Sequence, residues 1–225
     1  RTTPESLELQ ELFSEMVDKG VEYCVMEVSS HSLELDRVYG VKFEVGIFTN
    51  LTRDHLDFHK TFENYYKAKF KLLERSRIKI VNIDDNYGKQ VITDLSELNS
   101  ENVFSFSVKE KSTFKAFDEE MGSRNIKFKV NLNKEESFIL NIPGEYNIYN
   151  ALGAIAACFK VGIKIESIKI GIEKAVVPGR CERVGAEYNL PYEIIIDYAH
   201  TPDGLENILK TAKAFTKGRL ISIFG

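Results

Sequence analysis

The residues best suited to chemistry lie at the ends of two short apolar runs early in the chain. Residues 23–28 carry Glu27 near their end, and residues 45–50 are followed closely by His55. Both runs have the length and composition of buried strands. If these strands are parallel neighbours, Glu27 and His55 emerge at the same edge of the sheet, where open α/β sheets bind ligands. A carboxylate and an imidazole suit a divalent cation, so this edge is the predicted site.

Both side chains also fit ordinary structural roles. Glu27 could be a partly buried, hydrogen-bonded acid, and His55 a helix cap or a core histidine. In an extended segment, alternation would group His55, Asp57 and His59, which together with Glu27 suggests a metal-dependent hydrolase. In a helix, His55 and His59 would align instead.

The composition is that of a globular chain with a sizeable core. The sequence has 225 residues, of which 43% are hydrophobic, and a net charge of −4. No basic block supports a nucleic acid or an anionic membrane as partner. The three cysteines show no CxxC spacing, and there is no signal peptide or membrane-length apolar run. These features favour a cytoplasmic protein with reduced thiols.

Strands and helices alternate in the first part of the chain, which predicts an α/β fold with a doubly wound, mostly parallel sheet. Helical spacing predicts helices at residues 5–19 and 61–74, and a third buried strand is expected at residues 78–83. Shorter alternating runs predict a small antiparallel accessory sheet within residues 100–142. Its expected strands are residues 103–108, 126–132 and 138–142.

The remainder of the chain predicts a second domain. Alanine-rich residues 147–161 and then residues 165–174 are expected to be helical. The turn Val177-Pro178-Gly179 suggests a boundary between domains at residues 1–177 and 178–225. The second domain is expected to be the start of a Rossmann-like unit. Its expected elements are strands at 180–184, 192–196 and 220–224 and a helix from Pro202 to Ala214.

Seven ordered blocks of sequence together resemble the Mur ligase family, and they extend over nearly the whole chain. The blocks are Thr2-Thr3-Pro4, MEVSSHSLELDR at 26–37, FTNLTRDHLDFH at 48–59, YYKAKFKLL at 65–73, GEYNIYNALGAIAA at 144–157, PGRCERV at 178–184 and DYAHTPDGL at 197–205.

The resemblance implies an ATP-dependent amide ligase of peptidoglycan precursor synthesis. Family members transfer the γ-phosphoryl group of ATP to the D-glutamate carboxylate of UDP-MurNAc-L-Ala-D-Glu. A free amino acid, meso-diaminopimelate or L-lysine, then attacks the acyl phosphate. Because substrate and nucleotide are both anions, Mg²⁺ and positive donors are required to hold them together. The resemblance also implies a cytoplasmic monomer.

The family pattern assigns roles to individual residues around the metal. By resemblance to the family, Glu27 and His55 would be ligands of Mg²⁺. Lys69 matches the lysine that is carbamylated in family members. Carbamylation would turn this cation into an anion near the metal. Without the resemblance, Lys69 would be interpreted as a solvated lysine on a helix.

Two further groups of residues match binding positions in the family. The first group would contact the UDP-sugar peptide. It includes Arg37, whose guanidinium suits bidentate recognition of a carboxylate or phosphate. Its members are Thr2, Thr3, Ser29 and Arg37. Some members carry glutamine where this chain has Leu35. The positions that line the nucleotide are Asn147, Asn150, Arg180, Asp197 and His200. In a structural interpretation, Asn147 caps a helix and the others are exposed at strand or helix ends.

The sequence departs from the complete family pattern. It holds no G-x-x-x-x-G-K-[ST] motif, because Gly88-Lys89 lacks the upstream glycine. The expected phosphate loop would precede Arg1, and neither the uridine-binding domain nor the segment that selects the amino acid is expected within these residues. We therefore expect the middle portion of a three-domain ligase, inactive by itself.

Three alternatives remain open. Folylpolyglutamate synthase resembles the family in fold and reaction, although the block at 29–31 and DYAHTPDGL favour the peptidoglycan branch. A metal-dependent hydrolase would use Glu27, His55, Asp57 and His59. A non-catalytic remnant would bind ligands without turnover.

Overall fold

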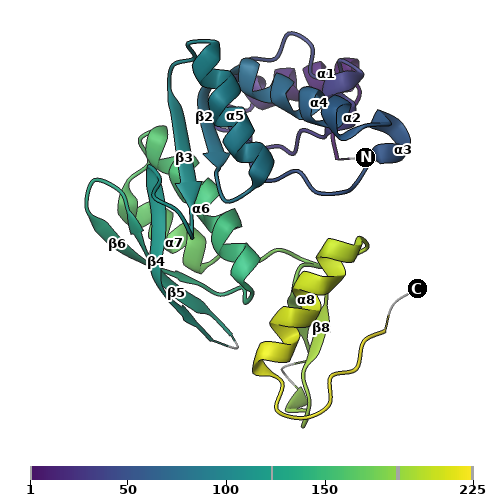
Figure 1. Ribbon diagram of the computed structural model, residues 1–225, viewed down its shortest axis with the longest axis vertical. Coiled ribbons are helices and arrows are strands. Elements are labelled where there is room, and N and C mark those ends of the chain that lie inside the picture. Colours follow the sequence, from purple (N-terminus) through teal and green to yellow (C-terminus); the bar gives the residue numbers. More distant parts are fainter. Residues whose placement is uncertain (1, 123, 186–187, 224–225) are drawn as a thin grey trace. The chain divides into compact units, whose positions relative to one another are not determined.

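The computed structural model describes residues 2–122, 124–185 and 188–223 (Figure 1). The chain divides into two compact units. Unit 1 comprises Arg1–Val81 and Asp85–Val103, and unit 2 comprises Asn82–Asp84 and Phe104–Gly225.

Unit 1 combines a parallel pair of strands with five helices. Its helices are α1 (Ser6–Asp18), α2 (Ser30–Glu34), α3 (Leu56–His59), α4 (Phe62–Glu74) and α5 (Asn86–Glu97), and its strands are β1 (Phe43–Phe48) and β2 (Ser76–Asn82). The two strands run in parallel, with Val45 opposite Ile78 and Ile47 opposite Ile80. The predicted helices at 5–19 and 61–74 and the predicted strands at 45–50 and 78–83 are confirmed within a few residues.

The apolar faces of α4 and α5 form one core with β1 and β2. It is made of Phe48, Leu51, Tyr65, Tyr66, Leu73, Val81, Val91 and Leu95. Thr61 caps α4 by accepting the Asn64 N–H, at 3.1 Å. Helix α5 was not predicted, although its signals are present, because Asp85 caps its first turn and Val91 and Leu95 are buried at helical spacing.

The strand predicted at residues 23–28 is wrong, because this segment is extended but unpaired. No ladder hydrogen bond involves it among the described residues, and the side chain of Val25 is 96% exposed. A strand exists only where a neighbour pairs with its backbone groups, and an apolar run does not specify that neighbour.

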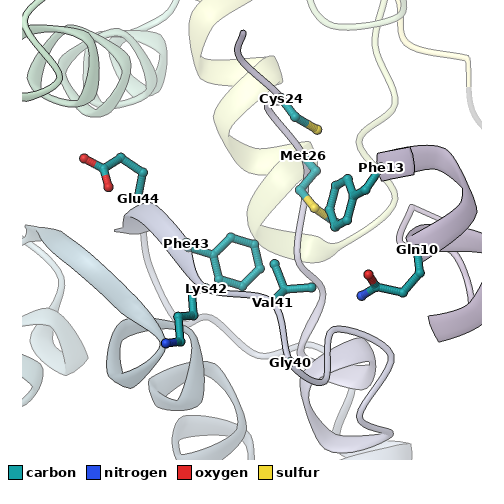
Figure 2. A pocket seen from close by; sticks show the side chains of 9 residues that line it. All are labelled: Gln10, Phe13, Cys24, Met26, Gly40, Val41, Lys42, Phe43 and Glu44. Atoms are coloured by element: carbon teal, nitrogen blue, oxygen red, sulfur yellow. The ribbon is translucent and has the colours of Figure 1, made fainter. Parts of the chain in front are cut away.

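A cavity of about 390 Å³ opens between this extended segment and the start of β1. Figure 2 shows Met26 and Phe13 on one side of it and Phe43 on the other. The lining residues are Gln10, Phe13, Cys24, Met26, Gly40, Val41, Lys42, Phe43 and Glu44, none of which is a predicted site residue. The cavity is therefore separate from the residues whose chemistry was predicted.

Unit 2 contains a curved set of strands that is covered by two helices. Its elements up to residue 173 are β3 (Val103–Ser107), whose first residue belongs to unit 1, β4 (Phe114–Met121), β5 (Ile126–Asn131), β6 (Glu135–Leu140), α6 (Glu145–Lys160) and α7 (Ile165–Glu173). Strands β4, β5 and β6 are antiparallel neighbours, whereas β3 pairs in parallel with β4. Helix α6 packs on β4 and helix α7 on β6 (Figure 1).

The predicted meander was incomplete because β4 was missed and β3 is not antiparallel to its neighbour. The second half of β4 is polar, and its register with β5 shifts between Phe117 and Glu120. Asp118 lies in the left-handed region there, with φ 54°. A bulge breaks the two-residue alternation on which strand prediction depends. The helices predicted at 147–161 and 165–174 are confirmed, as is the α/β class with parallel strand pairs.

The last part of unit 2 is a short hairpin followed by a helix. Strands β7 (Glu182–Val184) and β8 (Ile194–Ile196) are antiparallel, and α8 (Pro202–Phe215) begins with Thr201 as its cap. The guanidinium of Arg183 lies over the ring of Phe215, which joins β7 to α8. The predicted strand at 220–224 is wrong for residues 220–223, where Ile223 is 96% exposed and unpaired; Phe224 lies outside the described residues.

The close approach of β1 to β2 gives a test of unit 1. A Cβ atom at Gly46 would overlap the Ser76 hydroxyl and lie 3.0 Å from Ser76 Cβ, and that hydroxyl is fixed by donating to the Leu72 carbonyl at 2.6 Å. We expect Gly46→Ala to lower the free energy of unfolding by about 1–3 kcal/mol, as overpacking does. Urea denaturation followed by circular dichroism measures it.

Gly171→Ala is the matched control, because no atom lies within 4 Å of the added Cβ on helix α7. It should be neutral or stabilising by up to about 1 kcal/mol, given the helix propensity of alanine. Equal losses in both variants would contradict the close approach at Gly46.

Candidate functional site

Thr3 joins the beginning of the chain to the end of the extended segment. Thr3 is buried, with 1% of its surface exposed. Its hydroxyl donates to the Glu27 carbonyl at 2.9 Å and accepts the Ser29 N–H at 3.3 Å. Two predicted substrate residues are thereby placed beside Glu27. The Glu27 side chain itself is exposed.

Ser29 begins helix α2 and serves as its cap. Its hydroxyl accepts the Ser32 N–H at 3.1 Å, and its carbonyl accepts the Ser32 hydroxyl at 2.6 Å. The Ser29 side chain is therefore already committed to a structural role, which the sequence-based prediction did not include.

Arg37 is a part-buried cation with donor capacity left over. Its side chain is 13% exposed, and its terminal nitrogens contact the Thr3 carbonyl at 3.4 Å and the Glu5 carboxylate at 3.1 Å. The Arg37 Nε atom is buried and has no hydrogen-bond partner among the described residues. A buried unpaired donor is costly, so an anionic group that accepts from Nε would stabilise this arrangement.

His55 is held in a conformation that is unusual for a residue other than glycine. Its φ is 54°, at the start of the single-turn helix α3. The Asp54 carboxylate accepts the His55 N–H at 2.8 Å and lies 3.5 Å from Nδ1 of the ring. With Asp54 beside Nδ1, the Nε2 atom is the ring nitrogen left for a further ligand.

Lys69 is placed by the packing of α4 against β1. Its Nζ atom donates to the Asn50 carbonyl at 2.5 Å and lies 5.3 Å from the centre of the Phe48 ring and 5.6 Å from that of Tyr65. Burial among these groups lowers the pKa of Lys69 from 10.5 to about 8, against the opposing effect of Asp85 and Asp54.

A cluster of rings surrounds His55, and we call it the ring cluster. It consists of His31, His55, Phe58, His59 and Tyr65. The ring centres of His31 and His55 are 4.9 Å apart, and His59 stacks on Tyr65 at 5.0 Å. Burial lowers the pKa of both His31 and His59, with further lowering by neighbouring histidines.

The structure brings some predicted site residues together and leaves others apart. Lys69 and His55 share the Tyr65 ring as a neighbour. No contact recorded for the described residues joins the Glu27 carboxylate to either of them, so its place at a metal stays a prediction. No group of three or more His, Cys, Asp and Glu side chains among the described residues could hold a metal ion. The hydrolase-type cluster is therefore not formed, and His59 instead contacts Ser30 at 2.8 Å.

Unit 2 holds the second predicted group, which is organised by Asp197. Its two carboxylate oxygens accept the N–H groups of Cys181 at 2.7 Å and Ala199 at 2.8 Å. Burial, with Cys181 and Asp197 nearby, raises the pKa of the Tyr146 hydroxyl to about 12. Asp197 thus fixes the loop after β8 against the loop before β7.

The remaining members of this group combine structural contacts with exposed polar atoms. Asn147 is buried and donates to the Pro143 carbonyl at 2.8 Å, while exposed Asn150 donates to Asn147 at 3.1 Å. The Arg180 guanidinium lies 4.9 Å from the centre of the Tyr198 ring. The His200 ring packs against the same tyrosine, also at 4.9 Å between ring centres. Arg180 and His200 therefore both contact the exposed ring of Tyr198, the residue that follows Asp197.

Two domains of one known protein family match this chain. The pattern of the Mur ligase middle domain matches residues 1–158, and that of the Mur ligase glutamate ligase domain matches residues 179–225. The chain belongs to the Mur ligase family. The sequence resemblance is therefore confirmed.

Curated relatives share this sequence over its whole length. A UDP-N-acetylmuramoyl-L-alanyl-D-glutamate–2,6-diaminopimelate ligase of Clostridium perfringens is 65% identical over 226 residues, covering 100% of this chain and 47% of the relative. The ligase of the same name from Clostridium tetani is 56% identical over 227 residues, covering 100% of this chain and 46% of the relative. The chain thus spans about half the length of the relatives it matches.

A solved structure agrees with the fold of this Mur ligase chain. A structure of a UDP-N-acetylmuramoyl-L-alanyl-D-glutamate–2,6-diaminopimelate ligase matches with a TM-score of 0.80 and 27% identity, covering 94% of this chain and 44% of that one. In the part of the chain that the structure describes, no helix is both long and apolar enough to cross a membrane. Cys24, Cys158 and Cys181 are free, and Cys24 is exposed whereas Cys181 is buried.

The sequence-based prediction missed the roles of His31, Ser30 and Tyr65 in this Mur ligase chain. Their signal was spacing, since Ser30 and His31 directly follow the predicted substrate residue Ser29, and Tyr65 lies one helical turn before Lys69. Residues four apart share a helix face, which would have placed Tyr65 beside the lysine.

The low pKa of Lys69 is directly measurable. After reductive methylation with ¹³C-formaldehyde, the Lys69 resonance should titrate with a midpoint near 8, because burial disfavours the ammonium. The amine is therefore protonated below that pH and neutral above it. Lys69→Arg identifies the resonance by removing it, and Lys67→Arg, on the exposed face of α4, should leave it in place. A midpoint above 10 would contradict the burial of the amine.

Proposed function

We propose that this chain acts as part of a longer ATP-dependent ligase that joins 2,6-diaminopimelate to UDP-MurNAc-L-Ala-D-Glu through an acyl phosphate. The names of the curated relatives and their identity of 56–65% support this substrate. The observation that carries the proposal is the Lys69 amine, held among Phe48, Tyr65 and the Asn50 carbonyl with a lowered pKa.

The position of Lys69 suits carbamylation. Only a neutral amine attacks CO₂, forming the N–C bond of a carbamate and releasing a proton. With a pKa of about 8, a tenth or so of the Lys69 amine is neutral at pH 7, against less than about one part in a thousand at the ordinary value of 10.5. The fold therefore supplies the reactive form at the pH of cytoplasm.

The donor set at this edge fits Mg²⁺. A Lys69 carbamate and the exposed Glu27 carboxylate offer oxygen ligands, which hard cations prefer, and His55 offers Nε2. We propose that these three groups hold the ion. Bound there, Mg²⁺ would neutralise charge on phosphate oxygens, while Asp54 keeps the His55 ring oriented.

The acidic substrate would be recognised by unit 1. The unpaired Nε of Arg37 suits a carboxylate or phosphate oxygen, and Thr3 fixes the backbone at Glu27 and Ser29 beside it. Thr2, which is exposed, completes the proposed substrate group. Because the Ser29 hydroxyl caps α2 as an acceptor, its own contact to an anionic substrate would be made by donating its O–H hydrogen.

The nucleotide would be contacted by unit 2. Exposed Asn150, Arg180 and His200 are the proposed contacts, whereas Asn147 and Asp197 hold the local backbone that presents them. We propose a domain boundary at Val177–Pro178, which lies between the two matched family regions. The protein is proposed to be a cytoplasmic monomer.

A folylpolyglutamate synthase-like ligase is the alternative, because it would share the fold and the acyl phosphate. The two functions are separated by substrate. The longer protein should release phosphate from ATP with UDP-MurNAc-L-Ala-D-Glu and meso-diaminopimelate together, and not with a folate and glutamate. L-lysine in place of diaminopimelate tests the selection of the third residue.

Lys69→Ala in the longer protein should abolish ligation while leaving the fold intact. Because Lys69 packs against Phe48 and Tyr65, its removal should cost about 1 kcal/mol of stability, within the usual range for a single substitution, whereas the loss of the carbamate removes a metal ligand. Phosphate release and thermal unfolding measure the two effects. A short-chain carboxylic acid, with bicarbonate, should partly restore activity by occupying the place of the carbamate.

Lys67→Ala, two residues away on the exposed face of α4, is the control and should keep full activity. A Lys69→Ala enzyme with wild-type rates would refute the carbamate.

The chain of residues 1–225 should bind ATP weakly or not at all, since it holds no G-x-x-x-x-G-K-[ST] motif. The backbone N–H groups and lysine of such a loop make charge-assisted hydrogen bonds of roughly 1.5–3 kcal/mol each. Calorimetric titration with Mg²⁺ and a non-hydrolysable ATP analogue measures the affinity. Micromolar binding would place the nucleotide site elsewhere.

A further inference from the structure

The only hydrogen bond recorded between the side chains of α2 and α3, among the described residues, joins Ser30 to His59. The His59 Nε2 atom lies 2.8 Å from Ser30 Oγ, and the two residues are 4% and 5% exposed. The sequence separates them by 29 residues. Neither residue belongs to the sets proposed above for metal, substrate or nucleotide.

Each partner of this bond stands next to a proposed site residue. Ser30 follows Ser29 directly and opens α2, three positions after Glu27. His59 closes α3, one turn after His55. The Ser30–His59 bond therefore links the segment that carries Glu27 to the short helix that carries His55.

Helix α3 cannot keep this position through its own stability. It has four residues, and a single helical turn is unstable in isolation because its nucleation cost is not recovered. Its position depends on tertiary contacts. The rings of Phe58 and His55 pack against His31 of α2. The hydrogen-bonded and stacking contacts at His59 are the bond to Ser30, the stack on Tyr65 and the donation from Asn64 Nδ2 to its carbonyl at 3.0 Å. His55, with its positive φ, is the residue that caps this turn, so its ring position depends on where the turn lies.

We propose that His59 is a positioning residue, which acts through its buried hydrogen bond to Ser30 to fix the separation between Glu27 and His55. This inference rests on the proposed metal site of Glu27, His55 and Lys69. His59 touches neither metal nor substrate in this role. Its contribution is to hold the turn that carries His55 at a constant distance from the end of the extended segment. The Nε2 atom of His55 thereby stays within reach of Glu27.

The test measures the affinity of the longer protein for Mn²⁺, a paramagnetic substitute for Mg²⁺, in the absence of nucleotide. The electron paramagnetic resonance signal of free Mn²⁺ reports how much of the ion remains unbound. His59→Phe keeps a stacking ring and loses the hydrogen bond, and Ser30→Ala loses the same bond from the other side. Each should weaken the His55-dependent binding of Mn²⁺ about tenfold. This is the lower end of the loss in metal affinity that follows when a residue that orients a metal ligand is replaced. The double variant should be no weaker than either single one, because both remove one bond.

Two controls separate positioning from a general loss of stability. Tyr66→Phe removes another part-buried hydrogen bond, to Asp94, from helix α4 and should lower the unfolding temperature while changing Mn²⁺ affinity less than twofold. Ser30→Thr keeps the hydroxyl and should retain most of the affinity. Unfolding temperatures are recorded for every variant.

Several outcomes would overturn the proposal. Affinity changes below twofold in both single variants would refute it, as would independent, additive losses in the double variant. If His55→Ala removes Mn²⁺ binding while His59→Phe and Ser30→Ala do not, the metal site stands and only the role of His59 falls. If wild-type protein shows no binding that depends on His55, the proposed metal site fails together with the inference.

Discussion

The packing of helix α4 on strand β1 is the interaction on which the site in unit 1 depends. Phe48 of β1 and Tyr65 of α4 belong to the same apolar core, and Lys69 lies one turn after Tyr65 on that helix. The lysine amine must therefore enter a partly apolar environment, with the Asn50 carbonyl as its acceptor. Desolvation lowers its pKa, and the core that stabilises the unit thereby prepares the amine for reaction.

Several residues with assigned roles also serve the fold, and this limits how each can act. Ser29 caps α2, Asn147 holds the start of α6, and Asp197 accepts two backbone N–H groups. Such residues form rigid supports for exposed neighbours, because a side chain whose hydrogen bonds are satisfied by backbone loses conformational freedom. Arg37 differs, since its buried Nε has no partner within the described part of the chain and so retains capacity for a ligand.

The secondary structure was predictable where local signals were strong. Helix α4 has Thr61 as a cap and an apolar face, and α8 has Thr201 and Pro202 at its start, so both were found with nearly correct ends. Errors occurred where pairing decides the outcome. The runs at residues 23–28 and 220–223 have strand-like composition, but no strand of the described residues pairs with them, and β4 carries a bulge that hides its alternation.

The sequence by itself determined the family, the α/β class and the identities of Lys69, His55 and Arg37 as residues of interest, because these follow from ordered motifs and local periodicity. Only the tertiary structure decided that Lys69 lies against Phe48 and Tyr65, and that His59 contacts Ser30 and not a metal cluster. It also decided that the Nε atom of Arg37 is buried without a partner among the described residues. The physical reason is that desolvation and hydrogen-bond satisfaction depend on neighbours distant in the chain, and spacing along the sequence does not specify those neighbours.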